Sequence, residues 1–164
     1  MATCGASSQR SWHMSRIRAR GNKTTEVRLR MLLVRSSIKG WRMHPPAVPG
    51  RPDFEFPRAG IAVFVDGCFW HGCPRCFRRR RLPHNNRPYW TAKVDRNRRR
   101  DRTVTRMLRR QGWRVVRLWE HSLRDSRKVM ARLLESLASA SAEQASPRRA
   151  SYRWGGRTLA SAVV

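Results

Sequence analysis

Three cysteines lie within nine residues, in the stretch VFVDGCFWHGCPRC (63–76). Cys68, Cys73 and Cys76 have the spacing C-x4-C-x2-C. Zinc prefers four soft or borderline ligands in a tetrahedron, and short spacings let one loop supply several of them. The sequence therefore predicts a zinc site in this loop. The alternative is a set of three reduced thiols that hold no metal.

A fourth zinc ligand has to come from one of the nearby or more distant histidines. His71, His84 and His121 are the candidates. His121 follows a predicted strand, and the end of a strand can reach the loop of a neighbouring strand. If His121 closes the site, His71 remains as a titratable imidazole on a rigid loop. Such a group suits acid/base chemistry near neutral pH.

Phe69 and Trp70 lie between the predicted ligands. The two rings cannot both be buried easily while their neighbours bind zinc. Exposed aromatic rings on a rigid loop of a basic protein indicate stacking on, or wedging between, nucleic-acid bases. The alternative is that one of the rings packs against the sheet, which is common for aromatic residues.

The rest of the chain predicts a mixed α/β domain that positions this loop. Helix spacing, turn residues and β-branched runs give the order α, β, β, β, α, β, α, with a sheet of about four strands flanked by helices. IAVFV has no polar alternation and is expected to be a central strand. The expected elements are a helix from Thr25 to Gly40, strands at 41–44, 50–56 and 61–65, a helix at 88–111, a strand at 113–120 and a helix at 125–138.

Several carboxylates occupy positions where they have either a structural or a chemical role. Glu26 lies in the first turn of its helix, where it complements the helix dipole or serves a site. Asp53 begins a strand close to a sheet edge, although an aspartate after proline is usually a turn residue. Asp101 shares an otherwise apolar helix stripe with Asn97, so it needs a partner: an arginine or an active-site group. The members of that stripe are Trp90, Val94, Asn97, Asp101, Val104 and Leu108.

The formal net charge is +27, and only four of the 37 basic residues are lysines. Arginine pairs with phosphate through a bidentate fork, so this chain is expected to bind DNA or RNA. A bias in genome composition is the alternative source of the excess. No stretch approaches the roughly 20 apolar residues of a membrane span, and no secretory signal is visible. These features favour an intracellular location, where clustered cysteines indicate metal more often than disulfides.

The chain resembles the very-short-patch mismatch repair endonucleases, the Vsr family. The resemblance runs in order from about Ser11 to Leu123. It is carried by MSRIRARGNKTTE (14–26), PGRPDF (49–54), VFVDGCFWHGC (63–73), YWTAKVDRNRRRDR (89–102) and GWRVVRLWEH (112–121). GRPD alone is a weak signal, whereas GCFWHGC followed by WEH at this distance is specific. The resemblance implies a restriction-endonuclease-like single domain with a structural zinc site.

The resemblance also implies roles for individual residues. Asp53 and the main-chain carbonyl of Val65 would hold magnesium. His71 would be the general acid/base, and Glu26 would orient the water or the histidine. The remaining matches concern the zinc site, the DNA contacts and the support of the site. They are Cys68, Cys73 and His121 for zinc, with Cys76 added by spacing; Phe69, Trp70 and Trp90 for intercalation; and Asp66, Asn97 and Asp101 as supporting residues.

The implied activity is Mg-dependent nicking of duplex DNA, 5′ of the mispaired T of a T:G mismatch that arises by deamination of 5-methylcytosine. This step would start very-short-patch repair. The alternatives are a nuclease of the same fold that ignores mismatches, and a zinc-stabilised nucleic-acid-binding module without catalysis. The second alternative conflicts with the joint presence of Asp53, Glu26 and His71.

The expected organisation is a mobile arm at 1–10, the endonuclease domain at 11–139 and a disordered basic tail at 140–164. Cys4, in the arm, is taken as a free thiol without a role. The arginine run Arg78–Arg81 has no assigned meaning. We expect a monomer in the bacterial cytoplasm, associated with the nucleoid, with mismatch-containing duplex DNA and mismatch-repair proteins as partners.

Overall fold

The computed structural model describes residues 22, 24–77 and 86–145. A four-stranded sheet has the order β1-β2-β3-β4. Strands β1 (Arg42–Met43), β2 (Phe54–Phe56) and β3 (Ile61–Asp66) pair antiparallel, whereas β4 (Arg114–Trp119) is parallel to β3. The predicted element order and strand number are confirmed. The short 3-10 helix η1 (Pro57–Ala59) forms the predicted turn between β2 and β3.

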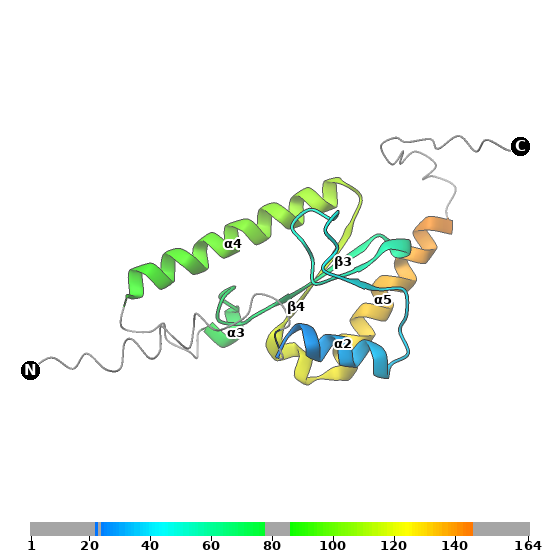
Figure 1. The fold of residues 1–164 in the computed structure, drawn as a ribbon, viewed down its shortest axis with the longest axis horizontal. Helices are drawn as coiled ribbons and strands as arrows, with labels where there is room; N and C mark the ends of the chain where they lie inside the picture. The colour runs from blue at the N-terminus through cyan, green and yellow to red at the C-terminus, as the bar shows by residue number, and fades with distance from the viewer. Residues whose placement is uncertain (1–21, 23, 78–85, 146–164) are drawn as a thin grey trace, which may run out of the picture.

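Helices cover both faces of the sheet (Figure 1). Helix α4 (Arg87–Arg110) lies on one face, and α2 (Glu26–Arg35) and α5 (Ser126–Ala145) lie on the other. All six residues of β3 are buried, as expected for a central strand. Successive side chains of β3 point to opposite faces of the sheet and enter two separate core clusters. Val63 and Val65 pack in the cluster on the α2/α5 face, and Ala62 and Phe64 pack with Leu108 of α4 on the other face.

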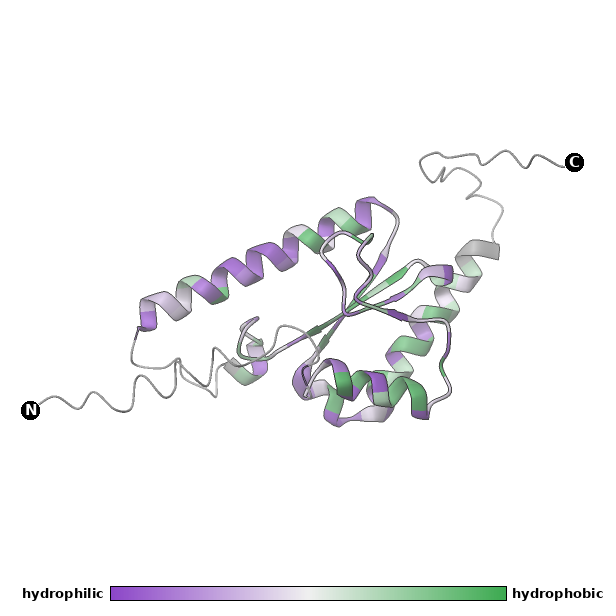
Figure 2. Cartoon of the chain, in the orientation of Figure 1, coloured by the Kyte–Doolittle hydropathy of each residue, from purple (hydrophilic) through white to green (hydrophobic). Residues whose placement is uncertain are grey.

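Helix α4 is mostly polar, with a few apolar positions along its length (Figure 2), and its two buried residues belong to the predicted stripe. Val94 and Leu108 are buried, while Asn97 and Asp101 are half-buried between them. The first half of α4 extends past the sheet toward the loop after β3 (Figure 1). The helix therefore connects the apolar core at one end to the candidate site at the other.

Some predicted boundaries are wrong. Helix α2 ends at Arg35 rather than near Gly40, because Ser37 adopts a left-handed φ of 53° that a helix cannot continue. Helix α5 continues to Ala145 rather than Ala138, so the first residues assigned to the tail are helical. Residues 1–21, 78–85 and 146–164, with Cys4, His84 and Arg78–Arg81, lie outside the described residues.

Helix α2 begins without a side-chain cap; the carbonyl of Asn22 accepts hydrogen bonds from the backbone N–H groups of Thr25 and Val27. Asp53 is not on an edge strand, because β2 pairs with strands on both sides. Asp53 lies just before Phe54, at the end of the sheet where β3 terminates.

Within the described residues, no helix is long and apolar enough to cross a membrane.

Candidate active site and metal centre

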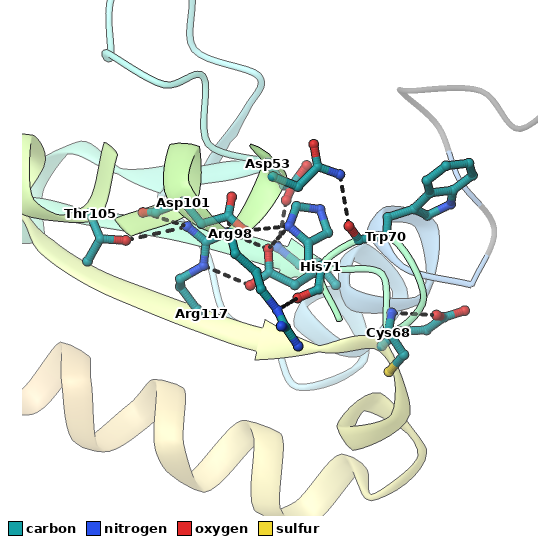
Figure 3. Close-up of polar contacts among 12 residues, drawn as sticks. Asp53, Cys68, Trp70, His71, Arg98, Asp101, Thr105 and Arg117 are labelled. Carbon is teal, nitrogen blue, oxygen red and sulfur yellow. Dashed lines mark hydrogen bonds and ion pairs between the residues drawn. The ribbon is translucent and has the colours of Figure 1, made fainter. Parts of the chain in front are cut away.

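The carboxyl ends of β3 and β4 are adjacent because the two strands are parallel, with Asp66 opposite Trp119. The loop after β3 and the short helix η2 (Glu120–Arg124) after β4 therefore emerge side by side. The backbone N–H of Cys68 donates to Oε2 of Glu120 at 3.1 Å and joins the two segments (Figure 3). The predicted cysteine and histidine ligands come from these two segments.

Cys68, Cys73, Cys76 and His121 place one ligand atom each within 4.8 Å of one another. Nδ1 of His121 lies 3.2 Å from Sγ of Cys68 and 3.5 Å from Sγ of Cys73. These separations are close to the ~3.5 Å edge of a zinc tetrahedron with zinc–sulfur and zinc–nitrogen distances of about 2.3 and 2.0 Å. The donor set fits zinc, and His121, rather than His71, is grouped with the cysteines; His84 lies outside the described residues.

Burial raises the pKa of the Cys68 thiol to about 12, and the neighbouring Cys73 and Cys76 add to this rise. A bare thiol there stays protonated at neutral pH. Zinc binding requires thiolates and favours the charged form. A zinc ion bound at this site would therefore have to displace the proton of Cys68.

His71 points away from the cysteines and toward α4 (Figure 3). Its Nδ1 lies 2.6 Å from Oδ2 of Asp101 and 3.6 Å from Oδ1 of Asp66. Burial by itself would raise the pKa of Asp101, but the hydrogen bond with His71 and the charge of Arg117 outweigh burial and lower it. Asp101 is therefore an ionised acceptor, and Nδ1 of His71 is the donor.

Arg117, on β4, joins the two carboxylates that flank His71. Its Nε donates to Oδ2 of Asp66 at 2.7 Å, and its Nη2 lies 2.9 Å from Oδ1 of Asp101. Burial would lower the pKa of Arg117, but these two carboxylates raise it overall. This guanidinium compensates the negative charge of the cluster Asp66–His71–Asp101.

Two side chains of α4 fix the backbone of the loop after β3. Nδ2 of Asn97 donates to the carbonyl of Trp70 at 2.8 Å, and Nε of Arg98 donates to the carbonyl of His71 at 3.4 Å. Gly72 has a φ of 61°, and a Cβ there would lie 2.5 Å from the Arg98 guanidinium. Glycine at this position is thus required for the loop to dock on α4.

Phe69, Trp70 and Trp90 form one aromatic cluster at the start of α4. The centroid of the Phe69 ring lies 5.2 Å from that of Trp70 and 5.6 Å from that of Trp90. Nζ of Lys93 lies 5.4 Å from the Trp70 ring. All three rings are half-buried, so each keeps an exposed part and is supported by its neighbours.

Asp53 belongs to a second acidic cluster beside the first. Its Oδ2 accepts a hydrogen bond of 2.6 Å from the backbone N–H of Val65. Burial raises the pKa of Asp53 to about 6; the Val65 hydrogen bond and His44 oppose this rise, whereas Glu26 and Asp66 add to it. Because Val65 and Asp66 are consecutive, the cluster Glu26–His44–Asp53 and the cluster Asp66–His71–Asp101 lie at the same end of β3.

Sequence reasoning missed three residues of this site. Arg117 gave a usable signal, a single charged residue inside the core strand VVRLW. Arg98 was hidden among many arginines of α4, and His44 had no local pattern that distinguished it. Their partners are far away in the sequence, so only the fold brings them together.

Comparison with known proteins agrees with this geometry. The sequence model for the family described as DNA mismatch endonuclease Vsr matches residues 5–76. The type II nicking enzyme V.XorIIP of Xanthomonas oryzae pv. oryzae is 36% identical over 125 residues, which cover 76% of this chain and 89% of that enzyme. The chain belongs to the Vsr family.

Two further relatives extend the comparison. The DNA mismatch endonuclease Vsr of Escherichia coli K12 is 33% identical over 129 residues, 79% of this chain and 80% of that protein. The type II nicking enzyme V.NaeI of Lentzea aerocolonigenes is 51% identical over 71 residues, but the match spans only 43% of this chain and 41% of that enzyme. The mixed sheet with flanking helices is accordingly the restriction-endonuclease-like fold of the Vsr family, and the expected resemblance is confirmed.

Proposed function

We propose that this chain is a Mg-dependent DNA endonuclease that nicks duplex DNA 5′ of the mispaired T in a T:G mismatch. Membership of the Vsr family, with relatives named as mismatch endonuclease and nicking enzymes, supports a mismatch-type DNA endonuclease. The observation that carries the catalytic part of the proposal is the Asp101–His71 pair beside a desolvated Asp53.

His71 is the proton-transfer group in this proposal. Because Asp101 is ionised and accepts from Nδ1, the bond fixes the ring orientation and directs Nε2 away from Asp101. An imidazole that is fixed through one nitrogen and leaves the other to face a substrate is suited to general acid/base catalysis. Asp66 and Arg117 hold Asp101 and the ring in this arrangement.

Asp53 is the expected carboxylate ligand of magnesium, and Glu26, expected to orient the water or His71, lies close enough to Asp53 to supply a second carboxylate to the same ion. Both carboxylates are largely removed from water, and the charge of Glu26 raises the pKa of Asp53. A divalent cation relieves this repulsion, and magnesium prefers one or two protein carboxylates with water completing its shell. The Val65 carbonyl is proposed as a further oxygen ligand. When bound, magnesium stabilises negative charge on the phosphate and lowers the pKa of water.

Phe69, Trp70 and Trp90 are the proposed wedge that enters the duplex. Unstacking one base step costs a few kcal/mol and costs less where pairing is already faulty, which favours a mismatch. The arginines of α4 supply the sequence-independent attraction to phosphates. The zinc ligands Cys68, Cys73, Cys76 and His121 keep the loop, and therefore His71 and the aromatic rings, in place.

A substrate panel tests this function. Duplexes labelled on each strand, with T:G, C:G, T:A and other mispairs in one sequence context, are incubated with the parent protein and magnesium. We expect a nick in the T strand of the T:G duplex and intact matched duplexes. Equal cutting of matched duplexes would indicate the mismatch-independent nuclease. Salt-sensitive binding without cutting of any duplex would indicate the binding module.

A further inference from the structure

His44 contacts the carboxylate of Glu26 through its side chain and the backbone of Asp53 through its own backbone. Its Nε2 lies 2.9 Å from Oε2 of Glu26, and its backbone N–H donates to the carbonyl of Asp53 at 3.1 Å. It has a left-handed φ of 47°, which is uncommon for a residue with a side chain. A conformation of this kind persists where the surrounding structure enforces it, and such positions concentrate at functional sites.

The side-chain geometry is that of neighbouring ligands around one ion. Glu26, His44 and Asp53 each place one ligand atom within 4.8 Å of the others. Adjacent ligands of an octahedral ion with bonds of about 2.1 Å are about 3.0 Å apart. The 2.9 Å separation of the His44 nitrogen and the Glu26 oxygen matches that edge.

The surroundings favour a cation here rather than in the neighbouring cluster. Glu26 is 3% exposed, and burial also removes Asp53 from water, so two desolvated carboxylates lie beside the His44 imidazole. In the cluster Asp66–His71–Asp101, by contrast, the Arg117 guanidinium already lies between the two carboxylates. The cluster Asp66–His71–Asp101 therefore already contains a compensating positive charge.

We propose that His44 is a nitrogen ligand of the catalytic divalent cation, completing a site of two carboxylates and one imidazole with Glu26 and Asp53. This inference rests on the proposed function, because it concerns the same cation. Imidazole is a better ligand for transition metals than for magnesium. The site therefore binds Mn²⁺ more tightly than Mg²⁺, and His44 is the source of the difference.

The test uses the full-length protein with its zinc site filled. Mn²⁺ is added to the zinc-loaded protein without DNA, and binding is followed by electron paramagnetic resonance. Pulsed measurements then detect ¹⁴N coupled to the bound Mn²⁺, and competition with Mg²⁺ gives the affinity ratio. We expect a ¹⁴N signal in the parent and its loss in His44→Gln, together with a decrease in Mn²⁺ affinity of about tenfold or more and a smaller change for Mg²⁺.

His71→Gln is the matched control, because it removes the other imidazole of the site; it is expected to keep the ¹⁴N signal. Loss of the signal in His71→Gln but not in His44→Gln would overturn the assignment. Mn²⁺ binding that depends on Asp53 but shows no ¹⁴N coupling would also overturn it, while leaving the proposed nicking activity intact. If Asp53→Asn leaves Mn²⁺ and Mg²⁺ binding unchanged and the parent does not nick T:G duplexes, both the inference and the proposed function fail.

Discussion

Nδ1 of His71 lies 2.6 Å from Oδ2 of Asp101, although the two residues come from a loop and a helix that are 30 residues apart in sequence. The bond explains why a carboxylate occupies the apolar stripe of α4. It also fixes the tautomer of the imidazole, since an ionised Asp101 accepts only from a protonated Nδ1.

Asp101→Asn is expected to reduce nicking by about a hundredfold or more, because an asparagine no longer stabilises the donor state of Nδ1 or a charged imidazole. Single-turnover rates on a T:G duplex measure the effect. Asp125→Asn is the matched control, since Asp125 is exposed and pairs with Lys128 away from the site. A rate equal to that of the control would show that Asp101 is a structural ion pair only.

Asp53→Asn is expected to stabilise the protein while it abolishes nicking. Burial raises the Asp53 pKa to about 6 from an ordinary 3.8, so the ionised carboxylate is unfavourable in the folded state. A shift of this size corresponds to at most ~3 kcal/mol. The Asn Oδ1 still accepts from the Val65 N–H, so the fold is retained.

The pH dependence of the free energy of unfolding tests the direction of the Asp53 pKa shift. A group whose pKa is higher in the folded state stabilises the fold most below its unfolded pKa, and this contribution is lost as pH rises through the folded pKa. The stability difference between Asp53→Asn and the parent should therefore grow from pH 4 to about pH 6 and then level off. Urea unfolding in metal-free buffer measures it. A difference that shrinks over this range would contradict the raised pKa.

Arg117→Met is expected to destabilise the fold by about 3 kcal/mol at neutral pH, because it leaves the carboxylates of Asp66 and Asp101 without their buried cation. The loss should diminish in acid, where the carboxylates protonate. Unfolding at pH 7 and at acidic pH, with the exposed Arg106→Met as a control, tests this. An equal loss of unfolding free energy at both pH values would show that Arg117 stabilises the fold by packing rather than by its charge.

Cys73→Ser is expected to lose zinc and folded protein together, because a structural zinc site supplies folding free energy. Elemental analysis of the parent should find about one zinc per chain. Cys4→Ser is the control and should retain the metal. Folded, active Cys73→Ser protein without zinc would contradict the assignment of the four ligands.

Trp90→Ala is expected to weaken binding to a T:G duplex by about 1–3 kcal/mol while changing matched-duplex binding less, because the ring stacks only where bases separate. A fluorescent base analogue beside the mismatch reports unstacking, and Met31→Ala on α2 is the control for loss of an exposed apolar side chain. If Trp90→Ala weakened binding to both duplexes equally, Trp90 would support the loop rather than stack beside the mismatch.

The element order was predictable because helix and strand periodicities are local. IAVFV identified the central strand, and the stripe through Val94 and Leu108 identified α4. The errors lie at helix ends. Helix α2 stops where Ser37 takes a left-handed conformation, five residues before the expected end at Gly40, because serine is not a residue type that predicts this conformation. Helix α5 continues through an alanine- and serine-rich segment whose composition had suggested a tail.

The site was only partly predictable. Asp53 and Glu26 acquired roles through the resemblance, because an aspartate after proline and a glutamate in a first turn are ordinary by themselves. His44 and Arg117 escaped detection because their contacts are tertiary: Arg117 meets Asp66 across 51 residues of sequence. Pairs of this kind depend on strand register, which a single sequence does not specify residue by residue.

The central claim is that Asp53 and His71 together cut a phosphodiester bond beside a T:G mismatch. Its most direct test is single-turnover nicking of a strand-labelled T:G duplex, with and without magnesium, by the parent, Asp53→Asn, His71→Gln and Asp125→Asn. The account predicts a magnesium-dependent nick 5′ of the mispaired T by the parent and by Asp125→Asn, and no nick by the other two proteins. Undiminished nicking by Asp53→Asn, or nicking by the parent without any divalent cation, would contradict it.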